Sequence, residues 1–167
     1  MAASLDSFTM SLTGNWSATD SDSFSSSYNS GSYSVTNAYG QTLSEPAKMS
    51  KMYRILDTAA GGATKDYDLH GTLLDFFKNT LSPSKVKSIV LIHSADSVAS
   101  SIFLEESATN PLVVGLSLPN LGPGGFFALS TMLAAGIPVT GGTADKISVT
   151  NNDGTNTATF QLVVGMD

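Results

Sequence analysis

Histidines are the first residues of this chain that could do chemistry, and there are two, His70 and His93. Each falls at a predicted strand end or turn, so we interpret both as surface or capping residues. Serines and aspartates are so frequent that a hydrolytic triad could be drawn around either histidine. No Gly-x-Ser-x-Gly segment frames a nucleophile, however. The sequence therefore predicts no catalytic residue.

Carboxylates are the second candidates. Asp20 with Asp22, and Asp66 with Asp68, would each put two carboxylates on one face of an extended segment. Calcium takes six or more oxygen ligands, so each pair is at most half of a site, and we interpret the acids as solvated. The chain has no cysteine, which excludes a thiolate site. We therefore predict no metal ion.

Two further patterns complete the search for a reactive site. Glu105 and Glu106 are neighbours on a predicted strand and should point to opposite faces, so they cannot act as a pair. The glycine-rich segments 61–65 and 122–125 lack the Walker spacing and lead into no convincing helix. The sequence therefore predicts no cofactor, and we expect the protein not to be an enzyme.

The composition excludes several classes of partner. Charged residues make up 13% of the 167 residues, the net charge is −6, and the few cations are scattered. A nucleic-acid site would need them clustered. The N-terminus lacks a basic segment followed by an apolar one, and the most apolar window, 126–139, is too short to span a bilayer. We expect a soluble protein made in a cytoplasm, with no nucleic-acid or membrane partner.

Alternating apolar and polar residues predict short strands from residue 46 onward. We expect three hairpins, each of two such strands joined by a turn, and the clearest surrounds the Asn/Asp/Gly turn at 151–156. The hydrophobic phase of Ile89-x-Leu91 and the strand after it recurs from Ile147-x-Val149 onward, which we interpret as repeated hairpin geometry. The predicted hairpins comprise residues 49–57 with 64–69, 86–92 with 101–105, and 146–150 with 157–164.

One helix is expected in this pattern, near residues 72–82. Thr72 and Asp75 form a variant of the capping box, Leu73 and Leu81 bound an apolar side, and Pro83 ends the segment. Seven to nine short strands with turns every 8–12 residues are typical of an all-β protein. The predicted fold class is an antiparallel β-sandwich, with a jelly roll as one arrangement, plus this short helix.

Residues 1–45 differ from the rest of the chain. Phe8 to Leu12 alternate as a first strand, and the serine-rich segment 17–34 has little to bury, which is typical of a flexible arm. Loose strands of the same domain are the alternative. We place the boundary between an N-terminal strand and arm, 1–45, and a β-sandwich domain, 46–167.

Aromatic residues along this arm are the candidate partner contacts. Aromatic side chains on a polar backbone can anchor a segment on another protein's surface. The four candidates are Trp16, Phe24, Tyr28 and Tyr33.

Four blocks of the sequence resemble small β-sandwich virion proteins of tailed phages and prophages, among them auxiliary capsid proteins of the cement or decoration type. The blocks are RILDTAAGGATKDYDLHG at 54–71, KVKSIVLIHS at 85–94, PGGFFALS at 123–130 and GIPVTGGTADKISVTNNDGTNTATF at 136–160. The resemblance spans roughly residues 48–165, leaves the N-terminal arm uncovered and carries no catalytic residue.

The resemblance implies a structural protein of the virion that binds the capsid surface and stabilises the phage head. Its partners would be the major capsid protein and copies of itself, commonly as a trimer at symmetry axes. The alternative is a tail-associated module that binds a receptor or carbohydrate, since aromatic residues on a β-sandwich suit sugar stacking. Trp16 and the tyrosines would form that platform.

Overall fold

The computed structural model describes residues 8–19, 28–39, 44–45, 47–71, 73–75, 78–97, 99–131 and 133–167. Within these residues the protein is all-β, and every pair of strands is antiparallel. The strands are β1 Phe8–Thr19, β2 Tyr28–Tyr39, β3 Lys51–Ala59, β4 Thr64–Asp68, β5 Lys85–His93, β6 Ile102–Glu106, β7 Phe126–Ser130, β8 Ile137–Pro138, β9 Lys146–Asn151 and β10 Ala158–Met166.

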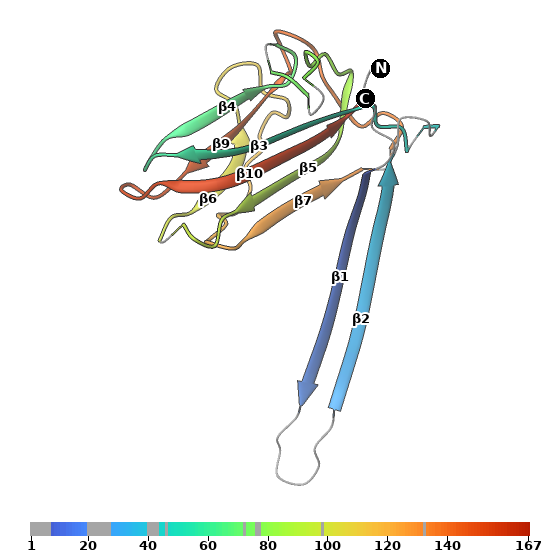
Figure 1. Ribbon diagram of the computed structural model, residues 1–167, viewed down its shortest axis with the longest axis vertical. Coiled ribbons are helices and arrows are strands. Elements are labelled where there is room, and N and C mark those ends of the chain that lie inside the picture. The colour runs from blue at the N-terminus through green and yellow to red at the C-terminus, as the bar shows by residue number, and fades with distance from the viewer. Residues whose placement is uncertain are drawn as a thin grey trace.

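Two sheets pack against each other to form the body of the molecule (Figure 1). The large sheet has the order β3-β10-β5-β7, with β8 beside β5, and the small sheet has the order β4-β9-β6. Alternate residues of a strand face opposite sides, so one side of each sheet supplies the apolar residues of the core. The predicted antiparallel β-sandwich is confirmed, while the jelly-roll arrangement stays a prediction. The core includes Tyr53, Ile89, Leu91, Phe160 and Leu162 from the large sheet and Tyr67, Ile102, Leu104, Ile147 and Val149 from the small sheet.

The three predicted hairpins are wrong, although their strands exist. In each case the two strands belong to different sheets: β3 and β4, β5 and β6, and β9 and β10 are all separated. Thus β9 pairs with β4 and β6, whereas β10 pairs with β3 and β5. Consecutive strands that each carry one apolar face can oppose these faces across a core, and a hairpin cannot do this. The recurring hydrophobic phase therefore reflects a repeated connection between sheets.

A buried asparagine holds the connection from β9 to β10. The Nδ2 of Asn151 donates to the carbonyl oxygens of Ala59, Ala60 and Asn156 at 3.0, 3.2 and 2.7 Å. Its Oδ1 accepts from the backbone N–H of Asp153 at 3.1 Å. One side chain thus ties the end of β3 to the loop that crosses between the sheets.

The same loop explains a glycine and an aspartate of the turn. A Cβ on Gly61 would lie 2.6 Å from the backbone nitrogen of Thr155, so the close approach of the two loops requires glycine there. The Asp153 carboxylate accepts from the backbone N–H groups of Asn156 and Thr155, which holds its pKa below the usual range. Residues 151–156 form a turn, as predicted, but this turn connects strands of different sheets.

The helix predicted near residues 72–82 is wrong for the described residues 73–75 and 78–82. Leu74 instead forms an antiparallel bridge with Thr80, and Leu81 donates its N–H to the carbonyl of Leu73 at 2.9 Å. The Asp75 carboxylate accepts from the backbone N–H of Asn79 and closes a loop where we expected it to cap a helix. Lys78 has a φ of 66°, which a right-handed helix cannot contain. Thr72, Phe76 and Phe77 lie outside the described residues.

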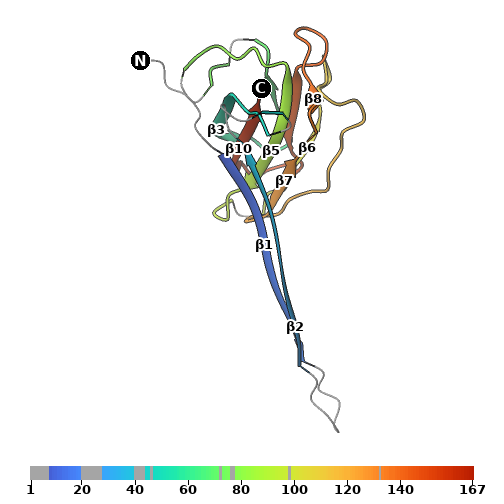
Figure 2. The ribbon, with the colours of Figure 1, turned by 90° about the vertical axis from the view of Figure 1, so that its right-hand side faces the viewer.

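Near the N-terminus, β1 and β2 pair along their whole length, from Phe8 opposite Tyr39 to Thr19 opposite Tyr28. We call this pair the ribbon. It projects away from the sandwich in both views (Figures 1 and 2), and twelve residues per strand make it about 40 Å long. The predicted first strand is confirmed and continues to Thr19. Residues 17–19 and 28–34 of the serine-rich segment are therefore paired strand, and residues 20–27 lie outside the described residues.

We predict that Asn151→Ala destabilises the fold by about 2–3 kcal/mol, because it removes a buried donor and leaves the carbonyls it served without that partner. Urea unfolding followed by circular dichroism measures the change. Asn152→Ala is the matched control at an exposed neighbour, where about 0.5 kcal/mol or less is expected. Equal losses for the two variants would contradict the anchoring role of Asn151.

Candidate functional site

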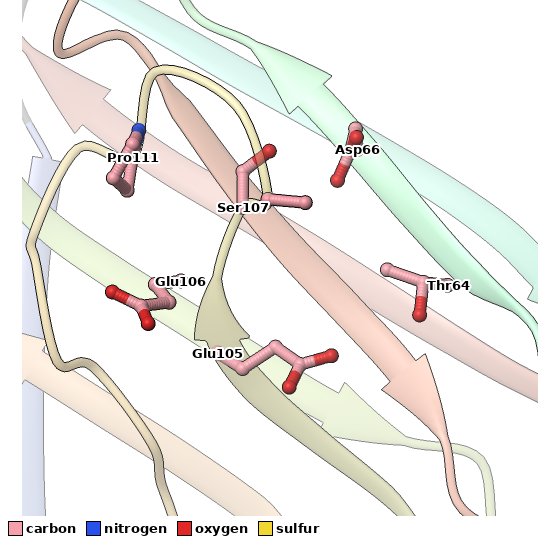
Figure 3. Close-up of a pocket in the computed structure, with 7 residues that line it drawn as sticks. Thr64, Asp66, Glu105, Glu106, Ser107 and Pro111 are labelled. Carbon is pink, nitrogen blue, oxygen red and sulfur yellow. The ribbon is translucent and has the colours of Figure 1, made fainter.

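A groove on the outer face of the small sheet is the first candidate site (Figure 3). It has a volume of about 580 Å³ and three carboxylates on its walls. Asp66 accepts a hydrogen bond from the hydroxyl of Ser148, and Glu105 accepts one from Thr150. The hydroxyls of Thr64 and Thr150 lie 2.6 Å apart. These bonds link the polar outer face into a network within the sheet. The groove is lined by Thr64, Asp66, Glu105, Glu106, Ser107, Ala108 and Pro111.

Glu105 and Glu106 point to opposite faces of β6, as predicted, and both border this groove. Glu106 is the last residue of β6, and its carboxylate accepts from the backbone N–H of Gly115. Figure 3 shows the two side chains pointing to different sides of the strand. Among the described residues there is no cluster of three or more metal-ligating side chains. The groove therefore presents acids that are already hydrogen-bonded within the protein.

The two histidines lie in different environments. His70 is exposed, as predicted. His93 is completely buried, which contradicts the surface alternative of our interpretation and leaves the capping alternative. Its Nδ1 donates to the carbonyl of Leu121 at 2.9 Å, and its Nε2 lies 3.0 Å from the hydroxyl of Ser100. Both ring nitrogens are thus used to hold together the loops around the β5–β6 connection.

An apolar surface covers the outer face of the large sheet. One row crosses all four strands through residue pairs Leu56–Gln161, Gln161–Ile92 and Ile92–Phe126. Three of its side chains are exposed, Leu56 by 73%, Phe126 by 57% and Ile92 by 39%. A small hollow of about 190 Å³ lies beside Leu56 and Ile92. We call the face made by this row and the next one the apolar face: Arg54, Leu56, Val90, Ile92, Phe126, Ala128, Gln161 and Val163.

The chemistry of the apolar face makes it the best candidate for a binding surface. Arg54 is its single charged residue, and the amide oxygen of Gln161, turned toward the guanidinium, accepts hydrogen bonds from it. Exposed apolar side chains that gather on one face commonly mark an interaction site. Burying one side chain such as Leu56 or Phe126 contributes about 1.5–3 kcal/mol. The two outer faces of the sandwich therefore differ, one networked and polar, the other apolar.

The sequence held a signal for this face that we did not use. Residues 89–92 are apolar without interruption. A strand with apolar residues on both faces is typical of a sheet that is buried on both faces. Val90 and Ile92 occupy its second side. Strand alternation was used only to find the core, so the outward residues of the run were not identified.

The structure places three of the four predicted aromatic contacts in the ribbon. Trp16 lies opposite Gly31, Tyr33 opposite Gly14 and Tyr28 opposite Thr19. This register puts Trp16 and Tyr33 on one face of the ribbon and Tyr28 on the other, because alternate pairs share a face. Phe24 lies outside the described residues. A partner contact through these residues stays a prediction.

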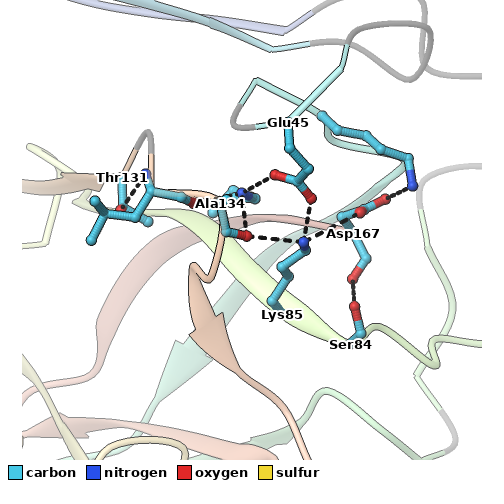
Figure 4. Close-up of polar contacts among 9 residues, drawn as sticks. Glu45, Ser84, Lys85, Thr131, Ala134 and Asp167 are labelled. Atoms are coloured by element: carbon cyan, nitrogen blue, oxygen red, sulfur yellow. Dashed lines mark hydrogen bonds and ion pairs between the residues drawn. The ribbon is translucent and has the colours of Figure 1, made fainter.

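Ion pairs join the segment after the ribbon to the body (Figure 4). One carboxylate oxygen of Glu45 pairs with Lys85, and the other accepts from Lys87 at 2.9 Å. Lys87 is completely buried and also donates to the carbonyls of Leu133 and Ala134 at 2.7 and 3.2 Å. Hydrogen bonds from the Lys85 and Lys87 ammonium groups hold the pKa of Glu45 below its usual range.

Comparison with known proteins identifies no family for this chain. No family model matches this chain, and no curated protein is significantly similar to it. In the part of the chain that the structure describes, no helix is of a length and apolarity that could cross a membrane.

We predict that the ion pairs of Glu45 make stability depend on pH. Because the pKa of Glu45 is lower in the folded protein than in the unfolded chain, its ion pairs stabilise the fold at pH values above the ordinary glutamate pKa of about 4.3. This stabilisation is lost as the pH falls through the pKa of the folded protein. Glu45→Gln should therefore lower Tm at neutral pH, and the gap to the unmodified protein should close in acid.

Thermal unfolding across this pH range measures the gap. Glu106→Gln is the control, because its carboxylate accepts from a backbone N–H and belongs to no described ion pair. A Glu45→Gln gap that stays constant with pH would contradict the role of the ion pairs.

Proposed function

We propose that this chain is a non-enzymatic structural protein of a phage virion, specifically a cement or decoration protein that binds and stabilises the head. The apolar face is the observation that carries the proposal. A component of a particle must attach to neighbours, and Leu56, Ile92 and Phe126 offer a surface that favours burial. The ribbon supplies a second feature that extends beyond the body (Figure 2).

The charge and the covalent chemistry of the chain support the same proposal. Few charges lie on the apolar face or in the ribbon, so many copies could pack without strong repulsion. The lack of cysteine makes assembly independent of redox state. The groups that an enzyme would use are engaged elsewhere, with His93 bonded at both ring nitrogens and Glu105 held by Thr150. We therefore propose that the protein has no catalytic activity.

The proposed partners are the major capsid protein and copies of the chain itself, on the capsid surface, after synthesis in the host cytoplasm. The proposed partners include neither a nucleic acid nor a membrane. The resemblance of residues 48–165 to auxiliary capsid proteins supports this choice of particle.

A second function is favoured by a different observation. The register puts Trp16 and Tyr33 on the same ribbon face, each opposite a glycine. Aromatic rings beside small residues suit stacking against sugars. The alternative is therefore a tail-associated module that binds a receptor or a carbohydrate.

Heads assembled without this protein test the main proposal. We predict that the purified chain cosediments with such heads, saturates at a fixed ratio to the coat subunits, and raises the temperature at which the heads disrupt. The coat protein used is the major capsid protein encoded nearest to this gene. Absence of saturable binding would overturn the proposal, and binding to a glycan array without binding to heads would favour the alternative.

A further inference from the structure

The ribbon is amphipathic in its register. In β1, apolar residues and glycine alternate with hydroxyl and amide residues without exception, and β2 places its valine and two of its tyrosines opposite the first set. Because directly opposed residues share a face, one face collects most of the apolar residues together with two asparagines of β2. The other face is dominated by serine and threonine and also holds Tyr28 and Ala38. We call the first the ribbon's apolar face: Phe8, Met10, Leu12, Trp16, Tyr33, Val35 and Tyr39.

A ribbon of this kind needs a partner surface. An isolated two-stranded ribbon is marginally stable in water, and it gains stability when an apolar face packs on another element. Both views show the ribbon standing clear of the two sheets for most of its length (Figures 1 and 2). The ion pairs of Glu45 with Lys85 and Lys87 anchor the following segment on the body. The segment after the ribbon is therefore held on the body, while most of the ribbon lies away from the two sheets and could contact another molecule.

The body offers a matching surface. The apolar face of the large sheet is open, and Arg54 is its single charge. The strands of the ribbon contain no charged residue. A charged partner would have to lose its hydration on either surface, which is costly without an ion-pair partner. Each surface thus suits an uncharged apolar counterpart, and each is such a counterpart for the other.

We propose that the ribbon of one copy packs, apolar face inward, on the apolar face of a second copy. The proposal deepens the proposed function, because copies of the chain are among its expected partners. Sheets commonly pack face to face with nearly aligned strands about 10 Å apart, so a two-stranded ribbon can lie along the large sheet. Trp16 and Tyr33 then serve as anchors on the ribbon, and Leu56, Ile92 and Phe126 receive them.

The area of the contact determines the kind of assembly. The longest strands of the large sheet have nine residues and are about 30 Å long, so a ribbon about 10 Å wide that is aligned with them covers roughly 300 Å² on each partner, or roughly 600 Å² in one contact. That is below the range of stable interfaces, which is about 1,200–2,000 Å². In a closed ring each copy gives one ribbon and receives another, so each takes part in two contacts and roughly 1,200 Å² of buried area. We therefore expect a closed oligomer, since a head-to-tail contact that does not close forms filaments.

Complementation between two variants of the full chain tests the proposal. Leu12→Asp disables the ribbon and leaves the apolar face intact, whereas Leu56→Asp disables the apolar face and leaves the ribbon intact. We expect the unmodified chain to be a closed oligomer by sedimentation velocity and native mass spectrometry. Each variant alone should associate at least about tenfold more weakly, because an aspartate replaces a leucine that becomes buried. Mixed at high concentration, the two variants should form a one-to-one heterodimer through the single contact that remains intact, weaker than the closed oligomer but stronger than the association of either variant alone.

Matched controls separate docking from folding. Ser11→Asp puts the same charge on the polar face of the ribbon, and Val114→Asp puts it at an exposed apolar residue outside the apolar face. Both should associate like the unmodified chain. Far-UV circular dichroism and thermal unfolding should show that all four variants remain folded, as expected for substitutions away from the core.

Three results would overturn the proposal: a monomeric unmodified chain, an oligomer that Leu12→Asp leaves intact, or a variant mixture that associates no more strongly than either variant alone. The second result, with loss of the oligomer in Leu56→Asp, would show that the apolar face pairs with itself. Binding to heads is measured separately. An oligomer that passes the complementation test but binds no head would overturn the proposed function and leave the ribbon contact in place.

Discussion

Burial of one apolar face from each sheet is the interaction on which the rest of the structure depends. Tyr67 of β4 and Phe160 of β10 meet edge to face across the two sheets, with ring centroids 6.4 Å apart. Within the body, consecutive strands other than β7 and β8 lie in different sheets, because each brings an apolar face that the other can cover. The connections must then cross the core edge, and polar groups such as Asn151 and His93 satisfy the backbone there.

The outer faces are what remains for function once the inner faces are buried. On the small sheet, hydroxyls and carboxylates bond to one another, which gives a polar face whose hydrogen bonds are made within the sheet. On the large sheet, Leu56, Ile92 and Phe126 are exposed, with Gln161 and Arg54 as polar neighbours, and the proposed partner would remove this apolar exposure. A binding role therefore follows more directly from this fold than a catalytic one.

Glu45, in the segment that follows the ribbon, is held by lysines of the body. Lys87 is buried in the body, and its charge is compensated by Glu45 and by the carbonyls of Leu133 and Ala134. A buried charge is costly without partners, so the position of Glu45 is determined by the body. The proposed docking of the ribbon on a neighbour would benefit from this attachment, since less conformational freedom is lost on docking.

Sequence patterns by themselves determined the all-β class, the approximate strand positions and the turn at 151–156, because alternation and Asn/Asp/Gly chemistry act between near neighbours. They failed near residues 72–82, where Asp75 closes a loop in place of a helix. Only the tertiary structure decided that β9 pairs with β4 and β6, that His93 and Lys87 are buried, and that Leu56 is exposed. Alternation says that a strand has an apolar face but not what covers it, and that choice is made by strands distant in the chain.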